Sequence, residues 1–138
     1  MGNIAEAWTF AEWTAAALCQ SGYRADFTID SLKEIDRFFD EQAPRGRPRR
    51  TGMLAEDTDA RLFGIGAYVG ETIRRAREGR WTGNDLDPLA KTDLAAKTGT
   101  GTTIWPIQKV MKRLKSRSDG LFAYGEAILL WHAEDGRK

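Results

Sequence analysis

Residues 58–78 read TDARLFGIGAYVGETIRRARE, and the rest of the predicted fold is arranged around this stretch. Apolar residues recur in it at intervals of three and four, which predicts a helix with an apolar stripe along one side. Phe63 and Gly70 widen that stripe well beyond a half-buried face, so we expect other elements to surround the helix. Acidic residues at its start and arginines at its end complement the helix dipole, and Gly79 is suited to end it in a left-handed conformation. The stripe itself comprises Leu62, Ile65, Gly66, Val69 and Ile73.

Three glycines inside this helix, Gly64, Gly66 and Gly70, resemble a dinucleotide-binding fingerprint. That fingerprint needs the order G-x-G-x-x-G between a strand and the first turn of a helix, where free amides face a pyrophosphate. Here the second interval is one residue too long, and the glycines lie inside a helix whose amides are already bonded. Glycine inside a helix costs about 1 kcal/mol relative to alanine. We therefore expect tight packing against Gly66 and Gly70 to offset that cost.

Two helices are predicted before residue 58. The first covers about residues 3–20, and its apolar positions at helical spacing are Ile4, Ala7, Trp8, Ala11, Ala15 and Leu18. The second begins with a capping box, Ser31-Leu32-Lys33-Glu34, in which each of the two polar side chains satisfies a free backbone N–H group. Pro44 ends this helix, because proline cannot donate the next backbone hydrogen bond.

After residue 80 the pattern changes to short β-prone pieces, at 81–84, 94–98 and 102–105. Turn residues at 99–101 predict a hairpin between the last two pieces. Pro106 then fits the first turn of a fourth helix, whose inward residues are expected to be Ile107, Val110, Met111 and Leu114. A fifth helix is expected from about 119 to 132, with a strand as the alternative for residues 127–131.

The predicted fold class is therefore α+β, with about five helices packed on a small antiparallel sheet of two to three strands. We expect a single globular domain over residues 1–138, since 138 residues can bury most of a core. Of the five tryptophans, three are most simply core residues: Trp81, Trp105 and Trp131.

Composition excludes several classes of site. The net charge is +1, which indicates no general affinity for polyanions. Cys19 and His132 are the only residues of their kinds, so an internal disulfide is impossible and a structural zinc site is nearly excluded. We expect no metal and no cofactor. The N-terminus has no basic segment followed by an apolar run, which favours a cytoplasmic protein without a membrane anchor.

Aromatic residues of the first helix suggest a partner interface. Trp8 and Trp13 are five residues apart, so they cannot both lie well on the inward stripe, and Phe10 falls on yet another face. Either the helix is largely covered by the rest of the chain, or an aromatic side chain is exposed for self-association or for another protein. We predict a partner interface that includes Trp8, Phe10 and Trp13.

The loop at 44–52 is basic and is expected to be exposed, and it carries Pro-Arg-Gly-Arg-Pro, which matches the core of an AT-hook. Such a peptide lies extended in a narrow A·T minor groove, where the negative potential attracts arginine. The candidate nucleic-acid residues are Arg45, Arg47, Arg49 and Arg50. A basic face on the fourth helix could help to bind phosphates, and it comprises Lys109, Lys112, Arg113, Lys115 and Arg117. The alternative is a solvated loop and a solvated helix face.

Glu71 is a candidate buried carboxylate, because it lies near the middle of the apolar helix. Apolar surroundings could raise its pKa and make it an acid or a base. An ion pair with Arg75, or a hydrogen bond from Tyr68 or from a neighbouring strand, is the simpler interpretation. Glu126 follows a similar short stretch and could form a site with Glu71 if the two converged.

The sequence of residues 66–73, with Trp81 and then residues 106–113, resembles a pattern seen in a family of small bacterial domains with a G-x-Y-x-G-E helix. The resemblance spans about residues 30–125, apart from the loop at 44–55. It implies a bacterial cytoplasmic protein and an α+β fold with a helix pair packed on a small antiparallel sheet. No activity is assigned to that family, so the resemblance implies no catalytic residue.

Together these observations favour a non-enzymatic domain that binds another protein, such as an immunity or accessory protein, or that self-associates. The alternative is a DNA-associated protein that uses the basic loop. An enzyme that uses Glu71 comes third. It ranks below the other two hypotheses because no histidine, nucleophile or metal set accompanies that carboxylate.

Overall fold

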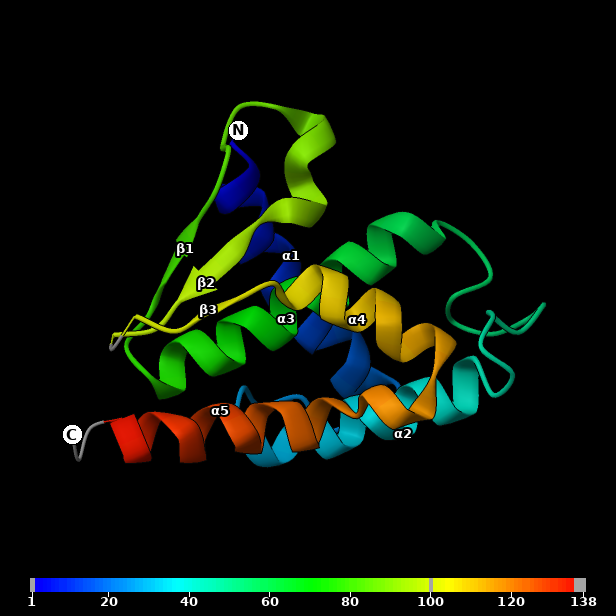
Figure 1. Ribbon diagram of the computed structural model, residues 1–138. Helices are drawn as coiled ribbons and strands as arrows, with labels where there is room; N and C mark the ends of the chain where they lie inside the picture. The colour runs from blue at the N-terminus through cyan, green and yellow to red at the C-terminus, as the bar shows by residue number, and fades with distance from the viewer. Residues whose placement is uncertain (1, 100, 136–138) are drawn as a thin grey trace.

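The computed structural model describes residues 2–99 and 101–135, with side chains as far as residue 130 (Figure 1). The described part contains five α-helices, three short 3-10 helices and three strands, which confirms the predicted α+β class. The α-helices are α1 (Asn3–Gln20), α2 (Leu32–Gln42), α3 (Thr58–Ala76), α4 (Pro106–Lys115) and α5 (Leu121–Asp135). The strands are β1 (Arg80–Thr82), β2 (Ala95–Lys97) and β3 (Thr103–Ile104). The 3-10 helices are η1 (Ile29–Ser31), η2 (Pro88–Asp93) and η3 (Arg117–Asp119).

Helix α3 is the centre of the fold. Every residue from Leu62 to Ile73 is buried, as the wide apolar circumference predicts. Helices α1, α4 and α5, strand β2 and the short helix η1 all contact it. Figure 1 shows α4 crossing in front of α3, while α2 and α5 lie side by side below.

Two of the α3 glycines allow other elements to approach its backbone. A Cβ atom on Gly66 would lie 2.6 Å from the Cα atom of Ile107 in α4. A Cβ atom on Gly70 would overlap the ring of Trp81 in β1. Real Cβ atoms do not approach other atoms so closely in a packed interior. These two glycines are therefore packing contacts, which agrees with the expectation that tight packing offsets their cost.

The three strands form one antiparallel sheet in the order β1-β2-β3. Trp81 pairs with Ala96, which in turn pairs with Ile104, and all three residues are buried. The predicted hairpin between β2 and β3 is confirmed, and the backbone N–H of Thr98 donates to Thr102 across it at 2.8 Å. Residue 100 of the predicted turn lies outside the described residues.

The start of α2 differs from the predicted capping box. The short helix η1 precedes α2, and the Thr28 hydroxyl, instead of that of Ser31, accepts a backbone N–H there. Glu34 accepts the N–H of Arg24, in the segment before η1. The prediction was wrong because the Ser31 hydroxyl is buried and lies 2.6 Å from the hydroxyl of Tyr68, a contact that only tertiary packing creates.

The end of α3 also differs from its prediction. Glu78, with φ of 50°, adopts the left-handed conformation expected of Gly79. A Cβ atom on Gly79 would lie 2.6 Å from the carbonyl oxygen of Lys97. Glycine is therefore needed at this position for the close approach of β2, and the reversal of the chain falls one residue earlier.

Helix α4 begins at Pro106 as predicted, but its inward face is only partly the predicted one. Ile107 and Val110 are buried, whereas Met111 is 41% exposed. Arg113 is buried in its place, because its guanidinium pairs with Asp36 and Asp40 of α2. A charged residue that finds partners elsewhere in the chain can lie inward, and helical spacing does not show this.

The other predictions for the second half of the chain are confirmed only in part. Helix α5 confirms the helix expected there and excludes the alternative strand at 127–131. The carboxylate of Asp36 accepts the backbone N–H groups of Leu121 and Phe122, at 2.8 and 3.0 Å, and so caps α5 from α2. Trp81 is buried as predicted, but Trp105 is 47% exposed. The side chain of Trp131 lies outside the described residues.

Candidate functional site

The predicted interface residues lie on two different flanks of α1. Small side chains face α3 and let the two helices approach, and they are Ala7, Ala11 and Ala15. Trp8 and Trp13 are both exposed, at 54% and 65%, so Trp8 is not on the buried face with the other apolar positions of the helix, and the alternative of exposed aromatic side chains is the one observed. Five residues correspond to about 140° around a helix axis. The two tryptophans therefore lie on opposite flanks and do not form one continuous surface.

Phe10 and Trp13 share one flank. Phe10 is half-buried, and its ring centroid lies 5.4 Å from that of Trp13. On its other side, Phe10 meets the buried ring of Phe63 edge-on at 5.4 Å. Aromatic pairs in this distance range add to the stability that burial provides. A row of three rings therefore runs from the surface of α1 into α3.

A groove opens beside Phe10, which we call the Phe10 groove. Its volume is about 440 Å³, and it lies between α1, the first half of α3, η2 and α4. The residues that line it are mostly apolar: Phe10, Asp59, Ala60, Leu62, Phe63, Pro88, Lys91, Thr92, Ile107 and Met111. The Lys91 ammonium pairs with Glu6 at 2.7 Å. Met111 faces this groove, which accounts for its exposure.

The same flank of α1 has a second, smaller hollow of about 270 Å³. Thr14 and Ala17 of α1 line it, together with Met53, Arg61 and Ile65 among others. Thr14 and Ala17 lie within about 60° of Phe10 around the helix. Apolar surface that the rest of the chain leaves uncovered therefore extends along this flank of α1.

The other flank of α1 contacts the Glu71 cluster, which consists of Glu71, Arg74, Arg75 and Trp81. The Arg74 guanidinium lies 5.7 Å from the ring centroid of Trp8, in the geometry of a cation–π contact. On the same side of the molecule, Arg75 pairs with Glu12 at 2.9 Å. The Trp8 side chain therefore has a partner within this chain, and the Phe10 groove lies elsewhere.

Glu71 is 3% exposed, and donors surround its carboxylate. Arg74 and Arg75 of the same helix donate to it, and so does the indole N–H of Trp81 at 2.9 Å. Burial raises the pKa of the Glu71 carboxyl, but the hydrogen bonds from Arg74, Trp81 and Arg75 outweigh burial, so its pKa is below the ordinary value. The carboxylate is therefore charged, and partners within the chain occupy it. Two of these partners were predicted, namely an ion pair with Arg75 and a hydrogen bond from a neighbouring strand. Glu126 is exposed on α5 and is not among its partners.

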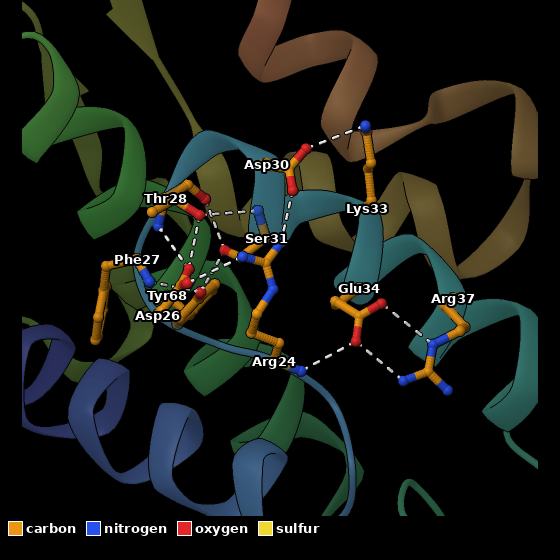
Figure 2. Close-up of polar contacts among 10 residues, drawn as sticks. All are labelled: Arg24, Asp26, Phe27, Thr28, Asp30, Ser31, Lys33, Glu34, Arg37 and Tyr68. Atoms are coloured by element: carbon orange, nitrogen blue, oxygen red, sulfur yellow. Dashed lines mark hydrogen bonds and ion pairs between the residues drawn. The ribbon is translucent and has the colours of Figure 1, made fainter.

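Tyr68 belongs to a separate buried network, drawn in Figure 2. The Ser31 hydroxyl donates to the Thr28 carbonyl at 2.6 Å, so the Tyr68 hydroxyl donates in turn to Ser31. The backbone N–H of Phe27 donates to the Tyr68 oxygen at 2.9 Å and helps to hold Phe27 at a φ of 61°. Burial raises the pKa of the Tyr68 hydroxyl, which keeps it protonated. The network joins the chain between α1 and α2 to α3.

The basic loop is folded back on itself. Its four arginines are exposed as predicted: Arg45, Arg47, Arg49 and Arg50. The backbone N–H of Gly46 donates to Ala43 at 3.2 Å, that of Arg49 donates to Gln42 at 2.8 Å, and Gly46 has a φ of 79°. An AT-hook lies extended in the minor groove, whereas this Arg-Gly-Arg segment forms a turn. The AT-hook resemblance is thus limited to sequence.

Comparison of the chain with protein-family models, with curated proteins and with solved structures gives no match. The resemblance to small bacterial domains with a G-x-Y-x-G-E helix therefore stays a prediction. No helix in the described part is long and apolar enough to cross a membrane. Among the same residues, no group of three or more His, Cys, Asp or Glu side chains has the arrangement of a metal site.

Proposed function

We propose that this protein is a non-enzymatic domain that binds another protein, and that an apolar side chain of the partner enters the Phe10 groove beside Trp13. The observation that carries this proposal is an open groove with mostly apolar walls, in which the ring of Phe10 packs against a tryptophan that is 65% exposed. Large aromatic residues beside a pocket are typical of the few side chains that dominate binding energy. An accessory or immunity protein would use a surface of this kind.

The polar groups of the interior support a binding role over a catalytic one. The carboxylate of Glu71 and the hydroxyl of Tyr68 are occupied by partners within the chain. In the described part, Arg77 Nε is the one buried side-chain polar atom without a hydrogen-bond partner. Such mutual satisfaction is typical of groups that stabilise a fold.

Helix α1 provides a matched pair of variants as the test. Trp13→Ala and Trp8→Ala each remove one exposed indole from the same helix, but only the Trp13 ring packs against Phe10, which lines the groove. A third variant, Met111→Lys, places a charge at the groove itself. We expect Trp13→Ala and Met111→Lys to weaken partner binding at least tenfold, as loss of a central interface residue does. Trp8→Ala should weaken it much less.

The unchanged protein and the three variants are each used to capture partner proteins from the host, and the amount captured is measured. The captured protein is then titrated against each of the four to give its affinity. Unfolding curves for each variant show whether the fold is intact. An equal loss of partner binding with Trp8→Ala and Trp13→Ala, or no loss of partner binding with either variant, would contradict the proposal. A change in solution mass of the isolated protein with Trp13→Ala would identify a second copy as the partner and would overturn binding to a different protein.

A further inference from the structure

The charges of this chain are strongly segregated along the sequence. Residues 43–52 and 106–118 together contain nine of the 21 lysines and arginines, and none of the 20 acidic residues. The rest of the chain therefore has 12 basic and 20 acidic residues. A net charge of +1 conceals this asymmetry, because it averages one basic region over an acidic remainder.

The fold brings these two segments together. A Cβ atom on Gly46 would lie 3.0 Å from the carbonyl oxygen of Lys115, so the turn of the loop rests against the last turn of α4. Figure 1 shows the loop at the right-hand edge of the molecule, beside the C-terminal end of α4. Arg45 and Arg47, on either side of that glycine, thus extend from a turn next to Lys115. Two segments whose contacting residues, Gly46 and Lys115, are 69 positions apart in sequence form one basic surface.

Three of the nine cations are neutralised within the chain. Arg113 is buried against Asp36 and Asp40, Arg117 also pairs with Asp40, and Lys109 pairs with Asp119 at 3.1 Å. The other six have no ion-pair partner among the described residues, and all six are exposed: Arg45, Arg47, Arg49, Arg50, Lys112 and Lys115. We call these six residues the basic surface.

The acidic side chains beside α4 are Asp36, Asp40 and Asp119, and each of them pairs with one of the three neutralised cations. The Glu41 carboxylate is held by Arg37 and by the hydroxyl of Tyr23. Glu56 lines a small hollow together with Arg50, at the edge of the surface that faces α3. Apart from Glu56 at this edge, the nearby carboxylates are paired within the chain, so the potential over the six cations is expected to be positive.

We propose that the basic surface binds the phosphate backbone of double-stranded DNA, a function separate from binding of a protein in the Phe10 groove. Four of its six cations are arginines, whose planar guanidinium groups bind phosphate with two parallel hydrogen bonds. Residues 44–51 contain no large apolar side chain that could enter a lipid bilayer, which favours a nucleic acid over an anionic membrane. Because the loop forms a turn supported by α4, the contacts are to phosphates along the duplex, without insertion of an extended peptide in the minor groove.

The test is fluorescence anisotropy of a labelled duplex of about 20 base pairs, titrated with the full chain between about 50 and 200 mM salt. We expect saturable binding at low salt, and a plot of log affinity against log salt with a slope of about −4. A·T-rich and G·C-rich duplexes should bind with similar affinity, because phosphate contacts carry no base information.

Three double variants locate the surface. Arg45→Gln with Arg47→Gln removes two charges from the loop, and Lys112→Gln with Lys115→Gln removes two from α4. Arg80→Gln with Lys97→Gln is the matched control, because it removes two exposed charges from paired positions of β1 and β2 on the other side of the molecule. The loop and α4 variants should each lose about tenfold in affinity and reduce the magnitude of the slope by about 2. The control should change both quantities much less.

Several outcomes would overturn the proposal. A flat titration at low salt excludes DNA binding, and so does binding to vesicles rich in phosphatidylserine without binding to the duplex. Equal losses for the strand control and the loop variant would show non-specific attraction to the whole molecule. Binding restricted to A·T-rich duplex and insensitive to the α4 variant would exclude the composite surface.

Discussion

A buried carboxylate is costly unless donors surround it, and Glu71 meets that condition with two guanidinium groups and one indole N–H. Two of its partners come from the next turn of its own helix, and the third comes from β1. The cluster thereby joins α3 to the sheet at the position where Gly70 lets Trp81 approach. At the scale of the residue, Glu71 is a structural cross-link.

Replacement of Glu71 by glutamine should therefore destabilise the protein. Removal of one partner from a buried pair costs about 3–5 kcal/mol, and we expect about 2 kcal/mol here because Arg74 and Arg75 are partly exposed. The folded-state pKa of Glu71 is lower than its ordinary value of 4.5, so its charge stabilises the fold above that pH. The difference in free energy of unfolding should be complete at neutral pH and should shrink as the pH falls below about 4.5.

Chemical denaturation of both chains at several pH values measures this difference. Glu12→Gln is the control, because Glu12 also pairs with Arg75 but its side chain is 62% exposed. A Glu71→Gln variant as stable as the Glu12→Gln variant at neutral pH would refute the structural role assigned to the cluster.

At the scale of the element, the packing of α4 on α3 depends on a missing side chain. Gly66 and Gly64 lie two residues apart on α3, but they meet different kinds of atoms. A Cβ atom on Gly66 would meet the backbone of Ile107, which cannot move without shifting α4. A Cβ atom on Gly64 would meet the terminal oxygen of the Thr14 side chain, which can rotate away.

The two alanine variants should therefore differ. Alanine favours a helix by about 1 kcal/mol relative to glycine, and overpacking of a core costs about 1–3 kcal/mol. Gly66→Ala should lower the free energy of unfolding by about 1–2 kcal/mol, because the atoms it would meet are backbone, whereas Gly64→Ala should be neutral or slightly stabilising. Urea denaturation, with the slope compared among the three chains, measures both effects. If Gly66→Ala were as stable as Gly64→Ala, the close approach of α4 would not depend on this glycine.

At the scale of the whole molecule, the two proposed surfaces are built from different parts of the chain. Trp13 and the Phe10 groove involve α1, η2, the first half of α3 and one face of α4, while the basic surface lies on the loop after α2 and on the end of α4. Only α4 contributes to both, with Met111 in the groove and Lys112 in the basic surface on adjacent positions. Side chains at adjacent helix positions point about 100° apart.

We therefore expect the two surfaces to act independently. Trp13→Ala should leave DNA affinity within twofold of the unchanged chain, and Arg45→Gln with Arg47→Gln should leave partner capture unchanged, since effects at distant sites are additive. Anisotropy and capture measured on both variants and on their combination provide the check. If the combined variant lost more DNA affinity than the loop variant alone, or more partner capture than Trp13→Ala alone, one surface would affect the other.

Spacing in the sequence was enough to predict the main elements. The intervals of three and four between apolar residues predicted α1, α3 and α4, and turn residues between β-prone pieces predicted the β2–β3 hairpin. The width of the apolar face of α3 also predicted its central position and the packing role of Gly66 and Gly70. These features depend on residues near one another along the chain, so local spacing encodes them.

Tertiary structure alone decided which side chains meet. Arg113 is buried because Asp36 and Asp40 lie opposite it, more than 70 residues away in sequence. Trp8 and Trp13 face different surroundings because α3 covers the face of α1 between them, and Gly46 rests on Lys115 because α2 and α4 end at the same side of the molecule. Helical spacing orders residues around one axis, but the partner of each face is set by how helices pack against one another. The groove beside Phe10 and the joined basic surface are consequences of that packing.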